Sequence, residues 1–188
     1  MAHFDLRSLP IRERSALLTR VVAPRPIALV SSRGADGRGN LAPFSYFMLG
    51  GSNPPSVAFC PVNDRHGAPK GTLRNARETG EFVISVVTAA MAERMNQTSY
   101  SYAHGSDEFD AAGFTRVASV AVRPPGVRES PVRLECRVYA IVPHGDGPSA
   151  GTYVIGEVVH VWVDDAMLTD GVLAHPRKNG RGGGKPML

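Results

Sequence analysis

Lys70 and Thr72 are the residues whose types and spacing most directly suggest binding chemistry. They stand at the start of a predicted short helix over Thr72–Glu78, with Thr72 as a candidate N-cap and Gly80 where a helix commonly stops. The free N–H groups and positive dipole end of such a helix receive a phosphate, and a Lys ammonium and a Thr hydroxyl add further donors. A capped surface helix with a solvated lysine explains the same residues.

A second candidate binding element is the stretch NLAPFSYFMLGGSNPPSVAFC at 40–60, in which Pro43 precedes the run Phe44–Phe47. Proline withholds an N–H from a strand ladder, so Pro43 predicts an edge or a bulge where neighbouring backbone groups are free to bond a planar heterocycle. Ser45 offers a hydroxyl, and the aromatic side chains offer stacking surface. An aromatic-rich barrel strand with an edge bulge is the alternative, and both interpretations stay open at this point.

The sequence lacks the motifs of several common catalytic and cofactor-binding sites. No G-x-G-x-x-G opens a βαβ unit and no G-x-S-x-G is present, while GRGGGK at 180–185 has the wrong spacing for a phosphate loop and is followed by Pro186 instead of Ser or Thr. None of the six histidines pairs with another at helical spacing, and no His/Asp/Glu cluster suggests a metal. The sequence therefore predicts neither a Rossmann site nor a metal centre.

Composition predicts one globular domain over residues 1–188. The chain is 43% hydrophobic and 20% charged, an ordinary balance for a packed domain. The formal charge of +4 and the pI near 9.4 raise the possibility of nucleic-acid binding. The arginines are nevertheless scattered from Arg7 to Arg181, so a solvated surface or a site for one small anion explains the charge as well. We expect no nucleic-acid partner.

The sequence also predicts a cytoplasmic protein with no membrane partner. No stretch approaches the ~20 consecutive apolar residues that a membrane-spanning helix needs. Asp5 and the run Arg12–Arg14 stand where a secretory signal would be basic and then apolar. Cys60 and Cys136 belong to no Cys-x-x-Cys pair, which indicates buried small hydrophobic residues and not a disulfide framework or a zinc site.

The elements that must position these groups are short strands and helices. Apolar periodicity and turn residues predict a helix that opens at Ser8 and Pro10 and ends before Pro24, a strand over 26–32, and a turn over 34–39 leading into the stretch that begins at Asn40. Further along they predict strands over 55–62 and 81–87, a helix from Thr88 to about Asn96 whose Met91 and Met95 pack in the core, and a helical turn at Glu108–Ala112.

The C-terminal third has the strongest periodicity. In PVRLECRVYAIV, residues 131–142, Leu134 and Cys136 point to one face while Glu135 and Arg137 point to the other, which predicts a half-buried strand. The run at 152–165, TYVIGEVVHVWVDD, is apolar enough on both faces to be central or to lie under a neighbouring subunit. Together they predict an antiparallel sheet long enough to curl into a barrel.

Six motifs taken together resemble a known family. They are VVAPRPIALVSS, NLAPFSYF, the Pro-Pro pair at 54–55, KGTLRNARETGEFVISVV, MNQTSYSYAHGSDEFDAAGF and VRESPVRLECRV with VIGEVVHVWVDD. In that order they are similar to the flavin reductase-like family of FMN-binding split-barrel proteins, with a core at about residues 15–184. The resemblance implies an all-β dominated, antiparallel, Greek-key-like split β-barrel with a few short peripheral helices.

The resemblance also implies a function and partners. It implies a homodimer that binds FMN at or near the subunit interface. It also implies reduction of flavin by NADH or NADPH, as in many members of the family, which often supply reduced flavin to a partner monooxygenase. The alternative on the same barrel is an FMN-holding electron carrier or an oxidase of another small substrate. A third hypothesis, a basic binding module without enzymatic activity, has only the high pI in its favour.

Cofactor-binding residues follow from the resemblance position by position. The stretch Asn40–Tyr46 is expected to line the isoalloxazine ring and ribityl chain, and Lys70 and Thr72 match the family's phosphate-binding Lys-Asp-Thr. Arg181 matches a C-terminal Arg-x-Gly-Gly element that folds over the site. The complete expected set is Arg25, Ser31, Asn40, Leu41, Ala42, Pro43, Phe44, Ser45, Tyr46, Lys70, Thr72 and Arg181.

This chain departs from the family pattern at three positions. Gly71 replaces the usual Asp of Lys-Asp-Thr, which loosens that loop or lets the backbone approach a phosphate more closely. Met48 replaces an Asn and Met187 lies near a usual Tyr, so the reductant's pocket differs from the pattern. His104 and Glu108 could border a second ring there, although both fit an ordinary loop and helix cap. No side chain is expected to act as a catalyst, because hydride transfer is the cofactor's own chemistry.

Overall fold

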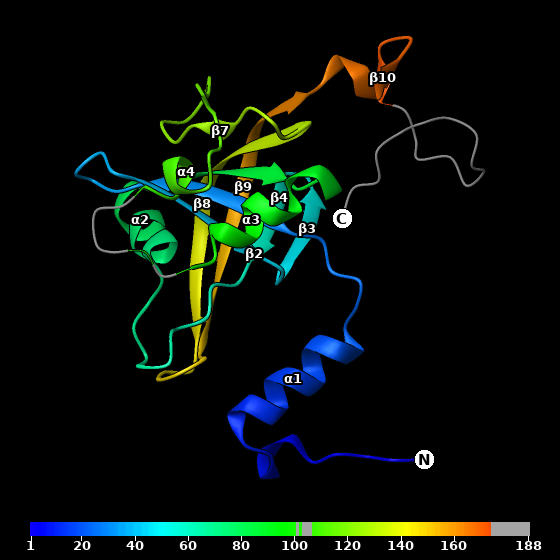
Figure 1. Cartoon of the computed structure of the whole chain (residues 1–188), viewed down its shortest axis with the longest axis vertical. Coiled ribbons are helices and arrows are strands. Elements are labelled where there is room, and N and C mark those ends of the chain that lie inside the picture. The colour runs from blue at the N-terminus through cyan, green and yellow to red at the C-terminus, as the bar shows by residue number, and fades with distance from the viewer. Residues whose placement is uncertain (101, 103–106, 174–188) are drawn as a thin grey trace.

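A seven-stranded antiparallel sheet forms the body of the protein (Figure 1). The computed structural model describes residues 1–100, 102 and 107–173. The strands lie in the order β2-β1-β5-β8-β9-β4-β3, and their bounds are β1 Ala28–Arg33, β2 Gly39–Phe44, β3 Phe47–Ser52, β4 Pro55–Phe59, β5 Glu81–Val86, β8 Val132–His144 and β9 Gly151–Val163. The prediction of an antiparallel, mostly β architecture is confirmed.

The ends of this sheet come together because it curls. β2 and β3 lie at opposite ends of the strand order, yet only Ser45 and Tyr46 separate them in sequence. Across the interior, the ring centroids of Phe44 on β2 and Phe59 on β4 are 5.1 Å apart, and Phe59 is 5.2 Å from Phe82 on β5. Side chains from strands far apart in the order therefore share one core. The stretch that begins at Asn40, expected to be one strand with an edge or a bulge at Pro43, is instead two strands separated by Ser45 and Tyr46.

Helices cover both sides of the β2-β1-β5 half of the sheet. Helix α2, Gly71–Thr79, packs Leu73 and Ala76 into the interior core with Ala28 and Val30 of β1. The opposite face, which carries Leu29 and Leu41, is covered by a second cluster. That cluster comes from η2 (Ala89–Met91), α3 (Ala92–Gln97), α4 (Glu108–Ala111) and the small β6–β7 pair, Arg116–Val117 with Gly126–Val127, and it includes Val87, Met91, Phe109, Phe114 and Val127.

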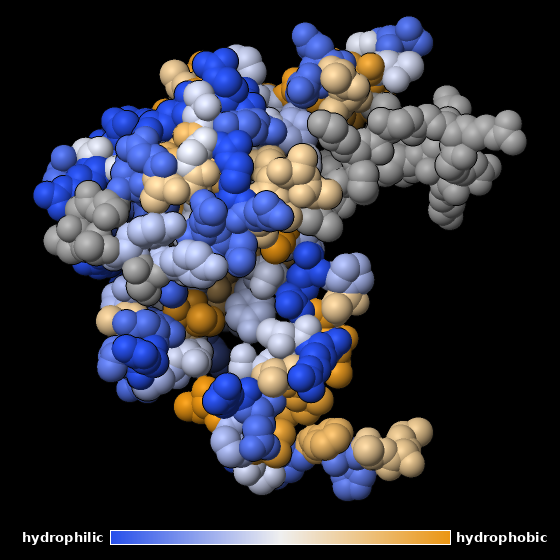
Figure 2. All heavy atoms as spheres, viewed as in Figure 1, coloured by the Kyte–Doolittle hydropathy of each residue, from blue (hydrophilic) through white to orange (hydrophobic). Residues whose placement is uncertain are grey.

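Helix α1, Ile11–Val21, extends away from the sheet (Figure 1). It follows the single turn η1, Leu6–Ser8, and none of its residues is buried by the part of the chain that the structure describes. Val21 and Val22 are 67% and 58% exposed, and Figure 2 shows apolar surface over this region. At the other end of the chain, η3 (Asp165–Met167) precedes the small pair β10–β11, Leu168–Thr169 with Val172–Leu173. Within the described residues, no helix is long and apolar enough to cross a membrane.

Two local expectations need correction. Lys70, with extended backbone angles, is the N-cap residue of α2, so Thr72 is not the cap but the second residue of the helix. Glu135 was expected to point to solvent, but only 1% of it is exposed. It lies on the outer face, where the loop between β6 and β7 covers it: its carboxylate accepts hydrogen bonds from the backbone N–H groups of Val120 and Ala121 and from Trp162 Nε1. Gly80, in the left-handed conformation, ends α2 as predicted.

Candidate functional site

The start of helix α2 is joined to strand β2 by a side-chain hydrogen bond. Asn40 Nδ2 donates to Thr72 Oγ1 at 2.8 Å. Because the threonine oxygen accepts this bond, its own hydroxyl hydrogen is available to donate to another acceptor. Between them, Gly71 leaves the space that Asn40 uses: a Cβ at Gly71 would lie 2.7 Å from Asn40 Oδ1. The glycine thus allows the Asn40 amide to hold the Thr72 hydroxyl in place.

A cavity of about 950 Å³ lies beside this junction. One wall is the β1–β2 turn with strand β2, and another is the loop that leads into α2 with α2 itself. The remaining walls are the segment after α3 and the N-terminus of α4. The lining residues are Gly34, Ala35, Asp36, Arg38, Gly39, Asn40, Ala42, Pro43, Phe44, Asp64, Ala68, Pro69, Lys70, Gly71, Thr72, Arg74, Asn75, Glu78, Thr98, Ser99, Tyr100, Tyr102, Asp107 and Glu108.

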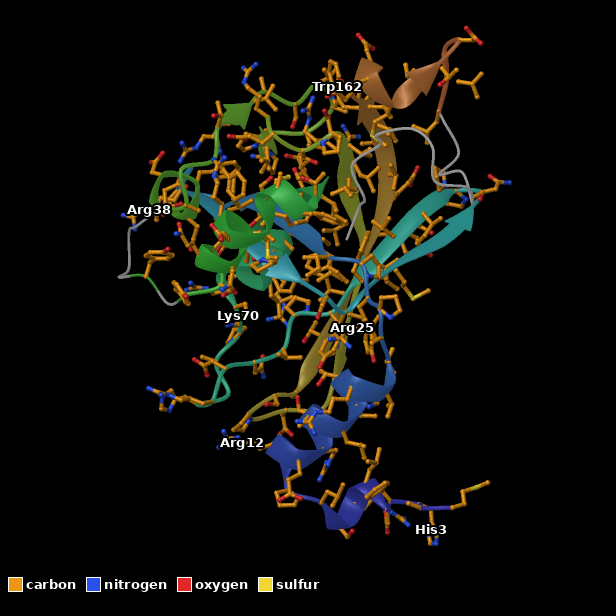
Figure 3. The ribbon with its side chains drawn as sticks, turned by 45° about the vertical axis from the view of Figure 1, so that its right-hand side comes forward. His3, Arg12, Arg25, Arg38, Lys70 and Trp162 are labelled. Carbon is orange, nitrogen blue, oxygen red and sulfur yellow. The ribbon has the colours of Figure 1, made fainter. Side chains whose placement is uncertain are left out.

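Three cationic side chains line the cavity near the start of α2. Lys70 immediately precedes the helix, Arg74 is on its first turn, and Arg38 comes from the β1–β2 turn. Figure 3 shows Arg38 and Lys70 on the same side of the molecule. Arg38 also pairs with Asp36, with Nε and Oδ2 3.3 Å apart, and both side chains are largely exposed. With the unpaired N–H groups of a helix N-terminus, these cations make the region suited to an anion such as a phosphate.

The opposite wall carries a partly buried carboxyl group. Glu108 Oε2 accepts a hydrogen bond from the backbone N–H of Leu41 at 3.1 Å, on the side of β2 that faces away from β1. Burial raises the pKa of Glu108, the hydrogen bonds from its own amide and from Leu41 oppose this, and the charge of Asp107 adds to the rise. Pro43, two residues further along β2, has no N–H on that same edge, consistent with the edge position predicted for it.

The structure brings together half of the predicted cofactor-binding residues. Asn40, Ala42, Pro43, Phe44, Lys70 and Thr72 all line the cavity. Leu41 contributes its backbone N–H there, while its side chain is buried in the cluster beneath α3 and α4.

The other predicted residues lie elsewhere. Arg25 Nη1 donates to the carbonyl oxygens of Thr19, at 2.6 Å, and of Val22, so it holds the C-terminal end of α1 (Figure 3). Ser31 is fully buried, and its hydroxyl donates to the carbonyl of Pro125. Ser45 and Tyr46 form the link between β2 and β3 and do not line the cavity. Arg181, Met187 and His104 lie outside the described residues.

The sequence analysis named Glu108 as a candidate beside a second ring, and Glu108 does line the cavity, but the analysis did not single out Arg38 and Arg74. Arg38 and Arg74 are 36 residues apart in sequence, and only the packing of α2 beside the β1–β2 turn brings both to one cavity. Asn75 Nδ2 donates to Ser32 Oγ at 3.1 Å and the backbone N–H of Ala35 donates to Glu78 at 3.4 Å, which fixes that packing. The sequence signal for Arg38 was the Gly-rich turn at 34–39, which predicted a hairpin but not that α2 would pack beside it.

Comparison with known families defines the class. The family model described as flavin reductase like domain matches residues 20–183. The chain belongs to this family, and its fold is the flavin reductase-like split barrel, an oxidoreductase class. The fold and family predictions are therefore confirmed.

Individual relatives agree with this assignment. An uncharacterized protein of Deinococcus radiodurans is 42% identical over 88% of this chain and 74% of its own length. Among solved structures, nitrilotriacetate monooxygenase component B from Bacillus cereus is 31% identical, with a TM-score of 0.86 over 92% of this chain and 86% of that one. The flavoredoxin of Desulfovibrio vulgaris is 27% identical, with a TM-score of 0.70 over 82% of this chain and 78% of that one.

Proposed function

We propose that this protein binds FMN in the cavity between β2 and α2 and catalyses the reduction of flavin by NADH or NADPH. The observation that carries the proposal is the cradle at Gly71. There, the missing side chain lets Asn40 orient the Thr72 hydroxyl beside Lys70 and the N-terminus of α2. A hydroxyl donor, an ammonium and free helix N–H groups are the partners that a terminal phosphate needs.

In this proposal, different walls of the cavity bind different parts of FMN. Lys70, Thr72 and the first amides of α2 hold the phosphate, while the edge of β2 from Asn40 to Phe44 borders the ring. When bound, FMN supplies the hydride-accepting chemistry, so no side-chain nucleophile is required. The protein's contribution is to orient two rings and to exclude water. A volume of 950 Å³ is near the upper end of the roughly 300–1,000 Å³ of ligand pockets, which supports room for a nicotinamide beside the flavin.

We further propose that the protein is a cytoplasmic homodimer that passes reduced flavin to a partner monooxygenase. Support for the partner comes from the similarity to a monooxygenase component B. Support for the dimer comes from exposed apolar side chains on α1 and β3, where Leu18, Met48 and Leu49 are 42%, 60% and 71% exposed. Reduced nicotinamides are cytoplasmic metabolites, which is consistent with that location.

A second candidate function, an FMN-holding electron carrier or an oxidase of another small substrate, is favoured by the similarity to a flavoredoxin. The two functions predict different responses to nicotinamides. A flavin reductase oxidises NADH or NADPH when flavin is present. A carrier holds yellow FMN that only a redox partner or another substrate reduces.

The test is an anaerobic titration of the FMN-loaded protein with NADH and then NADPH, followed at the visible flavin absorbance. We expect bleaching of that absorbance with one of the two, and turnover when free flavin and air are added. Tight FMN binding without bleaching would favour the carrier. Protein that stays colourless after incubation with FMN and shows no oxidation of either nicotinamide above the protein-free rate would reject both.

A further inference from the structure

Helix α4 is fixed in a way that leaves Glu108 facing the cavity. Asp107 caps the helix, since its Oδ1 accepts the N–H of Phe109 at 2.9 Å, while its Oδ2 lies 2.6 Å from Arg116 Nη2. The same arginine reaches Asp110 at 2.7 Å and lies 4.8 Å from the centroid of the Phe109 ring, which is fully buried. The side chains on either side of Glu108 are thus engaged elsewhere, and its carboxylate is positioned against β2.

The carboxyl group of Glu108 differs from those of Asp36 and Asp107, which also line the cavity. Asp36 pairs with Arg38 and Asp107 pairs with Arg116. Among the residues that the structure describes, no Lys, Arg or His nitrogen lies within 4.0 Å of a Glu108 carboxylate oxygen, so Glu108 forms no ion pair with them. Its one interresidue hydrogen-bond partner in the same part of the chain is the N–H of Leu41. Partial burial without a cationic partner favours the protonated form of a carboxyl group more than full solvation does, and the pKa of Glu108 is raised accordingly.

We propose that Glu108 takes up one proton from water when a hydride is delivered to a flavin in this cavity. The inference rests on the proposed function, in which NADH or NADPH is the hydride donor. A hydride brings two electrons and one proton, so it adds one negative charge to a partly buried site. Forming the O–H bond on Glu108 removes one negative charge, so the net charge of the cavity is unchanged. Two negative charges close together in a poorly solvated site are unfavourable, which supplies the driving force.

The other charged groups of the cavity set the background for this uptake. Lys70 and Arg74 lie at the start of α2 and Arg38 on the β1–β2 turn, while the other acidic residues that line the cavity are Asp36, Asp64, Glu78 and Asp107. On the wall before α4, the titratable lining residues that the structure describes are Tyr100 and Tyr102. Asp36 and Asp107 each have an arginine partner. Asp64 accepts the backbone N–H groups of His66 and Ala68, and Glu78 is exposed. Glu108 is therefore the carboxyl group placed to respond to a new charge.

The test is the pH dependence of the midpoint potential of FMN-loaded protein, comparing wild type with Glu108→Gln. Glutamine keeps an oxygen for the N–H of Leu41 but cannot take up the proton. One added proton changes a two-electron equilibrium tenfold per pH unit, so the wild-type potential should fall by about 30 mV more per pH unit than that of the variant. The difference is confined to the pH range between the pKa of Glu108 before reduction and its higher pKa afterwards.

Glu78→Gln is the matched control. Glu78 lines the same cavity and also accepts a backbone N–H, but it is exposed, so the wild-type slope is expected. A second readout is the infrared difference spectrum on reduction. A carboxylic acid C=O band should appear in the wild type and in Glu78→Gln but not in Glu108→Gln. Equal slopes and equal spectra in FMN-loaded wild type and Glu108→Gln would overturn the role of Glu108 alone. Failure of the wild type to bind FMN would overturn the proposed function as well.

Discussion

Gly71 shows how one missing side chain organises the candidate phosphate site. A Cβ at this position would lie 2.7 Å from Asn40 Oδ1, closer than real contacts allow. The Asn40 amide is the far end of a flexible side chain, so it would turn away and release the Thr72 hydroxyl. The family residue expected here, an aspartate, would cause the same clash and add a negative charge. The departure at this position therefore has a physical role in this chain.

The corresponding prediction is that Gly71→Ala weakens FMN binding about fivefold to tenfold, the effect of losing roughly one hydrogen bond. Riboflavin, which lacks the phosphate, should bind wild type and variant equally, as measured by quenching of flavin fluorescence. Gly51→Ala is the control, because the nearest atom to its added Cβ is 3.9 Å away. Unchanged FMN affinity in Gly71→Ala would remove Thr72 from the proposed site.

For single residues, the sequence indicated which side chains belong to the candidate site, but not which hydrogen bonds they make. Asn40, Lys70 and Thr72 were singled out from the family pattern, and the structure places all three on one cavity. The hydrogen bond from Asn40 to Thr72 spans 32 positions, and the one between Glu108 and Leu41 spans 67. Such pairings depend on how α2 and α4 pack on β2, which spacing along one chain does not encode.

At the scale of elements, Glu135 joins three segments: strand β8, strand β9 through Trp162, and the loop that carries Val120 and Ala121. Burial by itself raises the pKa of Glu135, but the hydrogen bonds from these three residues outweigh it and the pKa is lowered below its ordinary value of 4.5. The carboxylate is therefore the form that the folded protein stabilises. This contribution is present above pH 4.5 and is lost as the pH falls through the lowered pKa of the folded state.

We expect Glu135→Gln to reduce the free energy of unfolding at about pH 7 by roughly 1–3 kcal/mol, because the amide NH₂ replaces an acceptor that faces three donors. Urea unfolding at about pH 7 and about pH 3 measures this, and the difference between wild type and variant should shrink at the lower pH. Glu157→Gln, on the exposed face of β9, should change little at either pH. An equal loss at both pH values would show that the charge of Glu135 is not involved.

The sequence predicted the buried face of a strand well where apolar and polar residues alternate. It predicted burial poorly where a loop from another part of the chain covers the outer face. Leu134 and Cys136 do alternate with Arg137 as expected, but Glu135 is buried as well, since the loop between β6 and β7 folds over it. The break at Ser45 was missed for a related reason: a run of apolar residues does not reveal that its two halves pair with different strands, β1 and β4.

At the scale of the whole molecule, α1 is the least self-sufficient part. It has 11 residues, none of which is buried by the residues that the structure describes, whereas isolated helices shorter than about 12–15 residues are marginal in water. Its apolar residues therefore need a cover, which supports a second copy of the chain as the partner proposed above. Composition and periodicity indicated the apolar stripe of this helix, but not that the helix would extend away from its own sheet (Figure 1).

Leu18→Glu should shift the protein from a dimer to a monomer of 20.1 kDa, because a charge would replace an apolar contact at the covered surface. Light scattering coupled to size-exclusion chromatography gives the mass directly. Val120→Glu is the control, since Val120 is also exposed, at 68%, but lies on the loop between β6 and β7. A wild-type protein that is monomeric at all concentrations tested would contradict the proposed dimer.

The two-residue link of Ser45 and Tyr46 restricts how this protein can vary in evolution. Lengthening an ordinary surface turn costs little conformational entropy, so homologues are expected to differ in length at the turn over 145–150. The connection between β2 and β3 has no such freedom, because it joins the two ends of the strand order and directly follows the residues of β2 that line the cavity. Insertions there should be selected against even though neither residue lines the cavity.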